Sequence, residues 1–311
     1  MSTDRLPNLI MAGVNKAATT SLFMYLSAHP DICATRIKEV QYFLPLRYGA
    51  TQLPPIGEYQ KHFAHCQNEC YRMEATPGYF YGGTAVAAAI KQQISDVKII
   101  LMFRDPISRL FSFYKFKKSQ LELDDALTFE QYIAQCEALP GIERPKRENN
   151  VYWGIEGGFY ANYIEDWFDL FAEDSIKVLF FEHLKQNPAQ LLQHLCQWLG
   201  IEHESYLHEL DFSIENKSIH YKNAYLQKIG LAINWHGESF WRSHPSLKKY
   251  LRNIYYRFNG LPHQETISQE TRAYLTQLFA RPNEKLGEIL LRRGYSNLPE
   301  WINTVRVSKT K

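Results

Sequence analysis

Five short apolar runs recur along the chain, and they constrain its fold more than any other feature of the sequence. They lie at Leu9–Gly13, Ile32–Ala34, Tyr71–Ala75, Ile99–Phe103 and Ile176–Phe181. Continuous apolar runs of this length are typical of strands that are buried on both faces of a parallel sheet. Residues with helical spacing separate the runs, so the sequence predicts a doubly wound α/β fold with right-handed crossovers.

Signals at helix boundaries support this alternation of strands and helices. Asp105 and the proline after it predict a helix start, because Asp is a favoured N-cap and Pro suits the first helical position. Thr128 and Gln131 have the spacing of a capping box. A further helix is expected from about Pro188 to Leu199, where Gly200 can supply a left-handed stop.

The length of 311 residues fits one α/β domain with insertions, and we read residues 1–311 as a single domain. The net charge is only +2, which gives no overall field to attract nucleic acid or a membrane. We therefore expect no nucleic-acid partner, and any anion site has to be local. The sequence has neither a signal peptide nor a run of 18 uncharged apolar residues, so we expect no stable membrane insertion and a cytoplasmic location.

The five cysteines show no spacing that is typical of a zinc site, and their number is odd. We expect five packed or idle thiols in a reducing compartment and no metal site. They are Cys33, Cys66, Cys70, Cys136 and Cys196.

The segment Gly13–Ser21 lies where the first predicted strand passes into the first helix. A helix N-terminus offers unpaired backbone N–H groups and the positive end of a dipole, which together bind phosphate. Lys16 adds a mobile cation, and small residues let an anion approach the backbone. The residues that we expect to bind the anion are Lys16, Ala17, Ala18, Thr19, Thr20 and Ser21.

This segment is not a Walker A motif, which requires a second Gly directly before a Lys six residues after the first. Lys16 follows Gly13 by three residues, and Asn15 precedes it. A kinase-like nucleotide phosphotransferase is therefore disfavoured, although magnesium-dependent ATP turnover would revive that alternative.

Arg104 follows the fourth apolar run, and Ser112 lies two turns into the next predicted helix. Ligands of open α/β sheets bind at the carboxyl ends of the strands. A guanidinium at a strand end and a hydroxyl on the following helix can converge on one phosphate, to which Arg gives charge-assisted bonds. Taken separately, the two residues could instead be structural.

Together the two elements resemble the sulfotransferase family that uses 3′-phosphoadenosine-5′-phosphosulfate (PAPS). Gly13–Ser21 resembles its 5′-phosphosulfate loop, and Arg104–Ser112 resembles its 3′-phosphate motif. Lys38–Phe43 is similar to the segment that carries the catalytic glutamate in the heparan-sulfate-type branch, and Glu74–Phe80 to the acceptor-side segment. The resemblance extends over nearly the whole chain.

The resemblance implies a P-loop-like three-layer fold, in which helices flank a central parallel sheet of about five strands. It implies that Lys16 and Glu39 are catalytic, Glu39 as the general base that accepts the acceptor proton. Arg104 and Ser112 are implied to bind the 3′-phosphate of PAPS and of its product PAP, with no metal required. The aromatic side chains of Tyr79, Phe80 and Tyr81 could line an acceptor cleft, or they could be core.

Two positions depart from the family pattern. Ala75 stands where heparan-sulfate-type enzymes carry a lysine, which weakens the expectation of a heavily sulfated acceptor. Gly157 stands where the family often has an arginine, which removes one cofactor-side contact. The first expectation for the acceptor is a carbohydrate hydroxyl or amine, while a lipid, a peptide or a small metabolite is not excluded.

Residues 213–262 match the family least, and we read them as a variable basic insertion. The segment contains eight Lys or Arg residues and two Glu residues. It could be a lid over the donor or acceptor, or an amphipathic helical insertion with a solvated basic face. A binding module for nucleic acid or an acidic lipid surface, and a PAP-binding protein without catalysis, are alternatives from other functional classes.

Overall fold

The computed structural model describes residues 5–212, 220–237, 240–241, 244–261 and 265–302. All five predicted strands form, and they pair into one parallel sheet, which confirms the predicted fold class. The strands are β1 (Leu9–Gly13), β2 (Ile32–Ala34), β3 (Tyr71–Ala75), β4 (Lys98–Phe103) and β5 (Ile176–Phe180).

The order of the strands in the sheet is β2-β3-β1-β4-β5, so β1 is the central strand. Met11 of β1 lies opposite Ala75 of β3 on one side and Ile100 of β4 on the other. The chain passes from β1 to β2 and β3 on one side of β1 and then crosses over to β4 and β5 on its other side, so the carboxyl end of β1 lies at a topological switch point. Ligands of open α/β sheets bind at such points.

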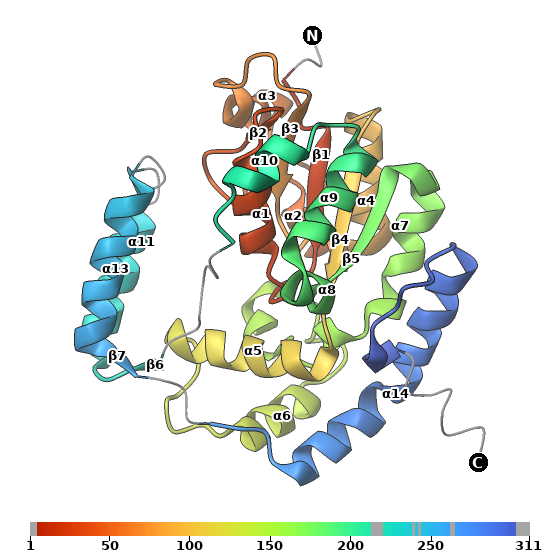
Figure 1. Cartoon of the computed structure of the whole chain (residues 1–311). Helices are drawn as coiled ribbons and strands as arrows, with labels where there is room; N and C mark the ends of the chain where they lie inside the picture. Colours follow the sequence, from red (N-terminus) through yellow and green to blue (C-terminus); the bar gives the residue numbers. More distant parts are fainter. Residues whose placement is uncertain (1–4, 213–219, 238–239, 242–243, 262–264, 303–311) are drawn as a thin grey trace.

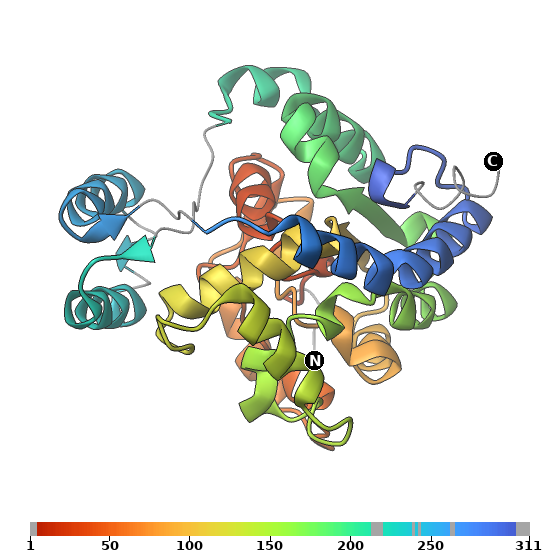
Figure 2. The same ribbon diagram turned by 90° about the horizontal axis from the view of Figure 1, so that it is seen from below.

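Helices cover both faces of the sheet (Figures 1 and 2). Helices α1, α8 and α9 lie on one face, whereas α4 lies on the other with α7 packed against it. The helices of this body are α1 (Thr19–Ser27), α2 (Leu44–Arg47), α3 (Ile56–Gln60), α4 (Gly83–Gln93), α5 (Pro106–Ser119), α6 (Phe129–Ala138), α7 (Ile164–Leu170), α8 (Phe181–Gln186), α9 (Pro188–Leu199), α10 (Glu204–Glu209) and α14 (Gln269–Arg292).

Short 3₁₀ turns connect several of these elements. They are η1 (Lys61–Phe63), η2 (Phe80–Gly82), η3 (Arg147–Tyr152), η4 (Glu156–Gly158), η5 (Tyr160–Asn162) and η6 (Glu173–Ser175).

The predicted helix boundaries are confirmed. The Asp105 carboxylate accepts hydrogen bonds from the first amides of α5, and Thr128 and Gln131 form a complete capping box on α6. Helix α9 ends at Gly200, whose φ of 70° lies in the left-handed region that glycine adopts without strain. Local sequence therefore determines where these helices begin and end.

The body has two hydrophobic cores. The larger surrounds the sheet and contains fully buried residues such as Ile100 and Trp167. The smaller lies beyond the carboxyl ends of the strands, among α5, α6 and the first half of α14, and includes Leu110, Tyr132 and Phe279. Helix α5 contributes to the smaller core and also faces the switch point.

The expectation of five free thiols is wrong, because Cys33 and Cys66 form a disulfide. The bond joins β2 to the residues after η1. The Cα atoms of the two cysteines lie 5.7 Å apart, within the usual range for a bridged pair. Sequence spacing could not reveal this pairing, which depends on folding the 33-residue loop back onto β2. Since disulfides persist in oxidising environments, cysteine usage no longer favours a reducing compartment.

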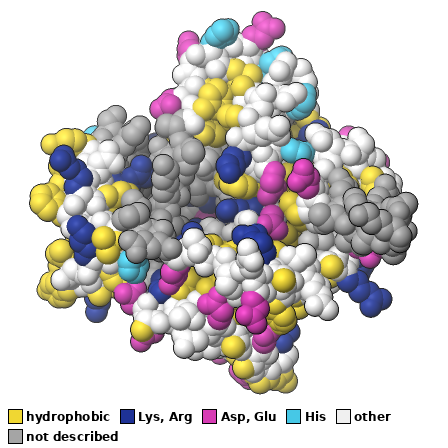
Figure 3. All heavy atoms as spheres, turned by 60° about the horizontal axis from the view of Figure 1, so that its bottom comes forward, with side chains coloured by type: hydrophobic (Ala, Val, Ile, Leu, Met, Phe, Trp, Pro, Cys, Tyr) yellow, Lys and Arg dark blue, Asp and Glu magenta, His cyan; other side chains and the backbone are white. Residues whose placement is uncertain are grey.

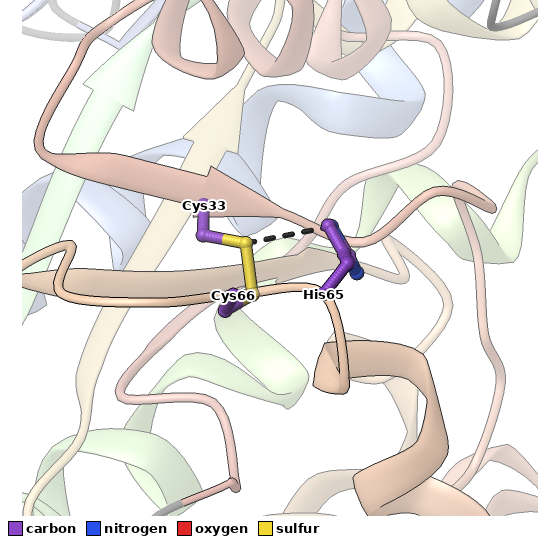
Figure 4. Close-up of side chains that lie close together, drawn as sticks. All are labelled: Cys33, His65 and Cys66. Carbon is purple, nitrogen blue, oxygen red and sulfur yellow. Dashed lines mark hydrogen bonds between the residues drawn. A yellow bond between two sulfur atoms is a disulfide. The ribbon is translucent and has the colours of Figure 1, made fainter.

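His65 lies beside this disulfide (Figure 4). Its Nε2 is 3.4 Å from Cys33 Sγ and 3.1 Å from the carbonyl oxygen of Ala34. The ligand atoms of Cys33, His65 and Cys66 lie within 4.8 Å of one another. The two sulfur atoms are bonded to each other, however, so neither is a thiolate ligand for a metal in this state.

A helical hairpin projects from the body at the left of Figure 1 and contacts it at the end of α5, where Gln227 Nε2 donates to the Ser119 carbonyl. It consists of α11 (Ala224–His236) and α13 (Pro245–Asn259) and is closed at its base by the antiparallel strands β6 (His220–Tyr221) and β7 (Gly260–Leu261). It occupies the described part of the expected basic insertion. Each helix in the described part of the chain is too short or too polar to span a bilayer.

Candidate active site

The loop after β1 turns sharply before α1 begins. Lys16 and Ala18 have φ angles of 70° and 62°, in the left-handed region. No side chain caps α1, and its first intrahelical hydrogen bond runs from Leu22 N–H to the Ala18 carbonyl. The amides of Thr19 and Thr20 precede that bond, so the positive end of the helix dipole faces the switch point.

Arg104 joins the two motifs that the sequence analysis identified separately. Its Nη1 donates a hydrogen bond to the carbonyl oxygen of Lys16, at 3.0 Å. The Tyr160 hydroxyl donates to the Arg104 carbonyl, and the guanidinium packs over the Phe181 ring with its carbon 4.3 Å from the ring centroid. Arg104 Nε is buried without a hydrogen-bond partner. The guanidinium is therefore fixed in place and keeps donor capacity.

One face of helix α5 meets the Lys16 loop. The Lys16 ammonium lies 4.2 Å from the centroid of the Phe116 ring, one turn beyond Ser112. Residues four apart share one face of a helix, so Ser112 lies on the face that meets the Lys16 loop. Ser112 is half-buried. The structure thus brings Lys16, Arg104 and the Ser112 face of α5 together.

Cations crowd around Lys16. Burial is the main cause that lowers its pKa to about 8, and the charges of Arg104, Lys38 and Lys115 lower it further, against a smaller opposing effect of Glu39. Burial likewise lowers the pKa of Arg104 and of Lys115. Figure 3 shows Lys and Arg side chains gathered near the middle of this face. Such a concentration of positive charge is unfavourable unless an anion binds there.

Glu39 lies at the rim of this cation cluster. Its backbone N–H donates to the Ala75 carbonyl at 3.0 Å, which holds its segment against the end of β3. The carboxylate accepts a hydrogen bond from Lys38 Nζ at 3.0 Å, and the Glu39 side chain is 43% exposed. A carboxylate in this position can be reached by a substrate.

Two further hydrogen bonds hold the same segment. Gln41 N–H donates to the Thr76 hydroxyl at 3.2 Å, and Phe43 N–H donates to the Tyr79 hydroxyl at 3.2 Å. The loop that contains Glu39 is therefore attached at three points to the end of β3 and the residues that follow it.

Glu74 of β3 is a second acidic residue close to the site, and the sequence analysis did not single it out. It is fully buried, and burial raises its pKa to about 8, with a smaller effect in the same direction from Glu39. The phenols of Tyr79 and Tyr59 lie beside it and lower its pKa less than burial raises it. Neither carboxyl oxygen makes a hydrogen bond of normal geometry. At neutral pH the Glu74 carboxyl is therefore mostly protonated.

Tyr79 and Phe80 have no exposed surface, and Tyr81 is 5% exposed. All three side chains pack in the core around the sheet, which favours the second of the two interpretations that the sequence left open. Tyr79 instead supports the Glu39 segment through its hydroxyl. The residue pattern after β3 does not predict this burial, because the chain turns back there as the 3₁₀ turn η2.

Arg109 explains the glycine at position 157. The Arg109 side chain is fully buried and donates to the Gly154 carbonyl. A Cβ atom at Gly157 would lie 3.0 Å from the Arg109 guanidinium nitrogens. The space that a side chain at position 157 would need is therefore taken by a guanidinium from α5.

Arg47 of α2 is another residue that the sequence analysis missed. Its guanidinium carbon lies 5.1, 5.0 and 4.9 Å from the ring centroids of Tyr48, Tyr81 and Trp153. It forms no ion pair with the carboxylates that the structure describes, and burial lowers its pKa. No single sequence motif predicts this cluster, because its rings come from three separate segments.

A surface cavity of about 600 Å³ opens away from these residues. Residues 51–56 and helix α4 border it, and its lining includes Tyr42, Leu46 and Gln93. Neither Lys16 nor Arg104 contributes to it. The chemistry of the site thus lies at the cation cluster and not at this cavity.

Comparison with known proteins gives a consistent result. The family model described as "Sulfotransferase domain" matches residues 6–250. The bifunctional heparan sulfate N-deacetylase/N-sulfotransferase 3 of Mus musculus is 26% identical over 310 residues, which cover 96% of this chain and 31% of the relative. The heparan sulfate glucosamine 3-O-sulfotransferase 3B1 of Mus musculus is 26% identical over 201 residues, 64% of this chain and 47% of the relative.

The chain spans about a third of the length of the N-deacetylase/N-sulfotransferases that it matches. Among solved structures, a sulfotransferase from Alicyclobacillus acidocaldarius has a TM-score of 0.67 at 21% identity, and the match covers 95% of this chain and 98% of that one. This likeness extends the shared fold over almost the whole chain. Since the family model covers most of the chain, from the Lys16 loop to α13, the protein belongs to the sulfotransferase domain family and is an enzyme of that family.

Proposed function

We propose that the chain transfers a sulfuryl group from PAPS to a hydroxyl or amine of a carbohydrate acceptor, with Glu39 as general base. The observation that carries this proposal is the hydrogen bond from Arg104 to the Lys16 carbonyl, which brings two anion-binding motifs together. A donor with phosphate groups at two positions of its ribose requires two such motifs side by side.

The chain's own residues fit that donor. Arg104 keeps a buried Nε without a partner, and Lys16 makes no ion pair with the carboxylates that the structure describes. We infer that Arg104 and Ser112 hold the 3′-phosphate. The amides and hydroxyls of residues 17–21 would hold the 5′-phosphate at the start of α1.

PAPS, when bound, supplies the sulfuryl group and a leaving phosphate. Sulfuryl transfer resembles phosphoryl transfer in its loose, in-line transition state, so positioning and electrostatics dominate catalysis. Lys16 stabilises the negative charge that develops on the leaving phosphate. Anion binding also favours the protonated form of Lys16, because it offsets the repulsion from Arg104 and Lys115.

Glu39 is the better of the two carboxyl groups for the proton transfer. The acceptor O–H or N–H proton passes to its carboxylate, as the acceptor oxygen or nitrogen forms the new bond to sulfur. Glu39 is 43% exposed and hydrogen-bonded to Lys38, whereas Glu74 is fully buried and mostly protonated at neutral pH. A buried, neutral carboxyl group cannot accept a proton from a bound substrate.

The acceptor class rests on the relatives and on one local contact. The relatives named above act on heparan sulfate, as their names state, although the chain spans only part of each. Arg47 lies between three aromatic rings and has no carboxylate partner among the described residues. Of these rings, the half-buried ones of Tyr48 and Trp153 suit a sugar, and a guanidinium without a carboxylate partner suits an acidic group on it. This cation compensates for the lysine that Ala75 replaces.

Thermal shifts with PAP and 5′-AMP test the donor half of the proposal, because the two nucleotides differ only in the 3′-phosphate. We expect PAP to give a clearly larger shift, and Arg104→Ala to weaken PAP binding by about 10–100-fold while leaving AMP binding nearly unchanged. Arg272→Ala, a change on the exposed face of α14, is the control. Equal shifts for PAP and AMP would refute the 3′-phosphate site.

Transfer of labelled sulfate from PAPS to a panel of acceptors tests the acceptor half. The panel holds N-deacetylated heparosan, a neutral oligosaccharide, a hydroxylated lipid and a small phenol. We expect the carbohydrates to be sulfated, and Arg47→Ala to raise KM for the acidic one more than for the neutral one. Transfer to the lipid or the phenol alone would refute the carbohydrate assignment.

A further inference from the structure

The exposed hydrophobic side chains of this protein are concentrated on its helical hairpin. Among the described residues, fifteen large hydrophobic side chains are exposed, and ten of them belong to residues 225–261. Scattered exposed hydrophobic residues are normal, but a contiguous apolar patch of this kind marks an interaction surface. The hairpin therefore exposes more apolar surface than is usual for a face that contacts only water.

The two helices turn their apolar faces outward. On α11, Leu226, Ile229 and Ile233 follow helical spacing and are 45%, 40% and 54% exposed. On α13, Leu251 and Phe258 share a face and are 42% and 76% exposed. Each helix thus presents an apolar stripe away from its neighbour.

Polar contacts hold the inner side of the hairpin. The Tyr255 hydroxyl donates to Gln227 Oε1 at 2.7 Å, and Asn259 Nδ2 donates to the Asn223 carbonyl at 3.2 Å. The Tyr255 ring also packs against Gly230. This arrangement reverses the usual one, in which paired helices bury their apolar faces against each other.

The charge of the two helices has one sign. Their sequences contain five Lys or Arg residues and no Asp or Glu: Lys228, Lys248, Lys249, Arg252 and Arg257. Figure 3 shows basic and hydrophobic side chains together on the hairpin, at the left of the molecule. A partner for this surface must accept apolar side chains and carry negative charge.

We propose that the hairpin docks on the surface of an anionic lipid bilayer. Apolar side chains flanked by Lys and Arg, with Tyr and Phe at the boundary, suit the interface between acyl chains and headgroups. Helix α13 has 15 residues and is about 22 Å long, shorter than a hydrocarbon core of about 30 Å. The helices therefore lie along the surface and do not span it.

Other occupants fit these observations less well. A second copy of the hairpin would bring two cationic surfaces together, which repel. Nucleic acid would use the cations but leave the apolar stripes exposed to water. The bilayer surface accounts for both features at once.

Sedimentation of the full chain with vesicles tests the proposal. We expect binding to vesicles of equal parts phosphatidylcholine and phosphatidylglycerol, little binding to pure phosphatidylcholine, and weaker binding as salt increases. The double variant Ile229→Glu/Ile233→Glu and the double variant Lys228→Glu/Arg257→Glu should each reduce the bound fraction at least about tenfold. Ile142→Glu, at a position that is 82% exposed on the body, is the matched control and should bind like the unmodified chain.

The thermal shift with PAP checks that each variant is folded, because none of these residues touches the candidate active site. Equal sedimentation with both kinds of vesicle overturns the proposal. It is also overturned if Ile142→Glu reduces binding as much as the α11 variant does. A dimer in solution that Ile229→Glu/Ile233→Glu dissociates would assign the surface to a second copy of the chain instead.

Discussion

The two halves of the candidate site are held in place by different means. The donor half, which comprises the Lys16 loop, Arg104 and the Ser112 face of α5, lies at the ends of the neighbouring strands β1 and β4. The acceptor half, which comprises residues 34–65 and the loop after β3, is mostly irregular backbone. It is closed by the Cys33–Cys66 disulfide and attached to β3 by hydrogen bonds.

The electrostatics of the two halves also differ. Like charges crowd the donor half and burial lowers the pKa of Lys16, so this half is poised to bind an anion. In the acceptor half the carboxylate of Glu39 is accessible beside the cation cluster, and the carboxyl group of Glu74, in the adjoining strand β3, is buried and mostly neutral. The rigid sheet thus holds the cation cluster together despite its mutual repulsion. The irregular acceptor half is held by the disulfide, and the Glu74 carboxyl group next to it is buried in its neutral form.

The largest expected effect lies in the acceptor half. Glu39→Gln removes the proposed base and should lower kcat by about 10²–10⁴-fold while PAP binding stays unchanged. Single-turnover transfer together with the PAP thermal shift measures both quantities. Glu58→Gln, an exposed change in the same disulfide-closed segment, is the control. A loss of less than about tenfold would mean that another group accepts the proton.

Lys16→Met should separate function from stability in the donor half. It removes charge stabilisation of the leaving group, and kcat should fall by about 10²–10³-fold. The folded-state pKa of Lys16 lies near 8, below its ordinary value of 10.5, so its charge costs stability below pH 8. The variant should be more stable than the unmodified chain at pH 7, by an amount on the order of 2–3 kcal/mol.

That gain has a defined dependence on pH. It should fade between pH 8 and 10.5, where Lys16 of the unmodified chain loses its proton in the folded state. Chemical denaturation of both proteins at several pH values measures it. A Lys16→Met protein that is less stable than the unmodified chain at pH 7 would contradict the inference that the charge of Lys16 destabilises the folded state.

Removal of the disulfide should loosen the acceptor half and spare the donor half. The bond closes a loop over a sequence separation of 33 residues, and Cys33→Ala/Cys66→Ala should lower the free energy of unfolding by about 3–4 kcal/mol. Denaturation curves measure this loss, and Cys70→Ala, at an exposed free cysteine, is the control. PAP affinity should stay within about twofold, because no donor residue lies in that loop. Equal losses of PAP affinity and acceptor affinity would show that the two halves are not separable.

The smallest effect on activity is expected at Glu74. Its folded-state pKa is raised from 4.5 to about 8, so its contribution to stability is complete below pH 4.5 and is lost as pH rises through 8. Glu74→Gln should leave activity at pH 6 almost unchanged and make the protein more stable than the unmodified chain at pH 8.5. Unfolding curves at these two pH values measure the difference. A variant that is inactive at pH 6 would give Glu74 a direct part in the reaction.

Much of the fold and the donor half could be predicted from local sequence. Buried strands leave continuous apolar runs, and caps such as Asp105 and Gly200 are local signals. Lys16 and Arg104 each follow a predicted strand, and parallel strands bring their carboxyl ends to the same edge of the sheet.

The acceptor half resisted prediction because its contacts join distant segments. Three features depend on the positions that irregular loops adopt in the folded chain: the Cys33–Cys66 pairing, the aromatic rings around Arg47 and the burial of Tyr79. The protonation of Glu74 depends on its depth in the fold, which no residue pattern encodes. Arg109 could not be connected to Gly157 before the structure placed α5 beside η4.

The two-residue ladder between β6 and β7 has a consequence for how this chain can change over time. Tyr221 lies opposite Gly260, so the two ends of the hairpin are next to each other where it joins the body. A segment with adjacent ends can be lost, exchanged or lengthened without moving the sheet, because the gap that it leaves is short. The body and the hairpin can therefore evolve independently, and related proteins can differ in the hairpin while they keep the same Lys16 loop and Arg104.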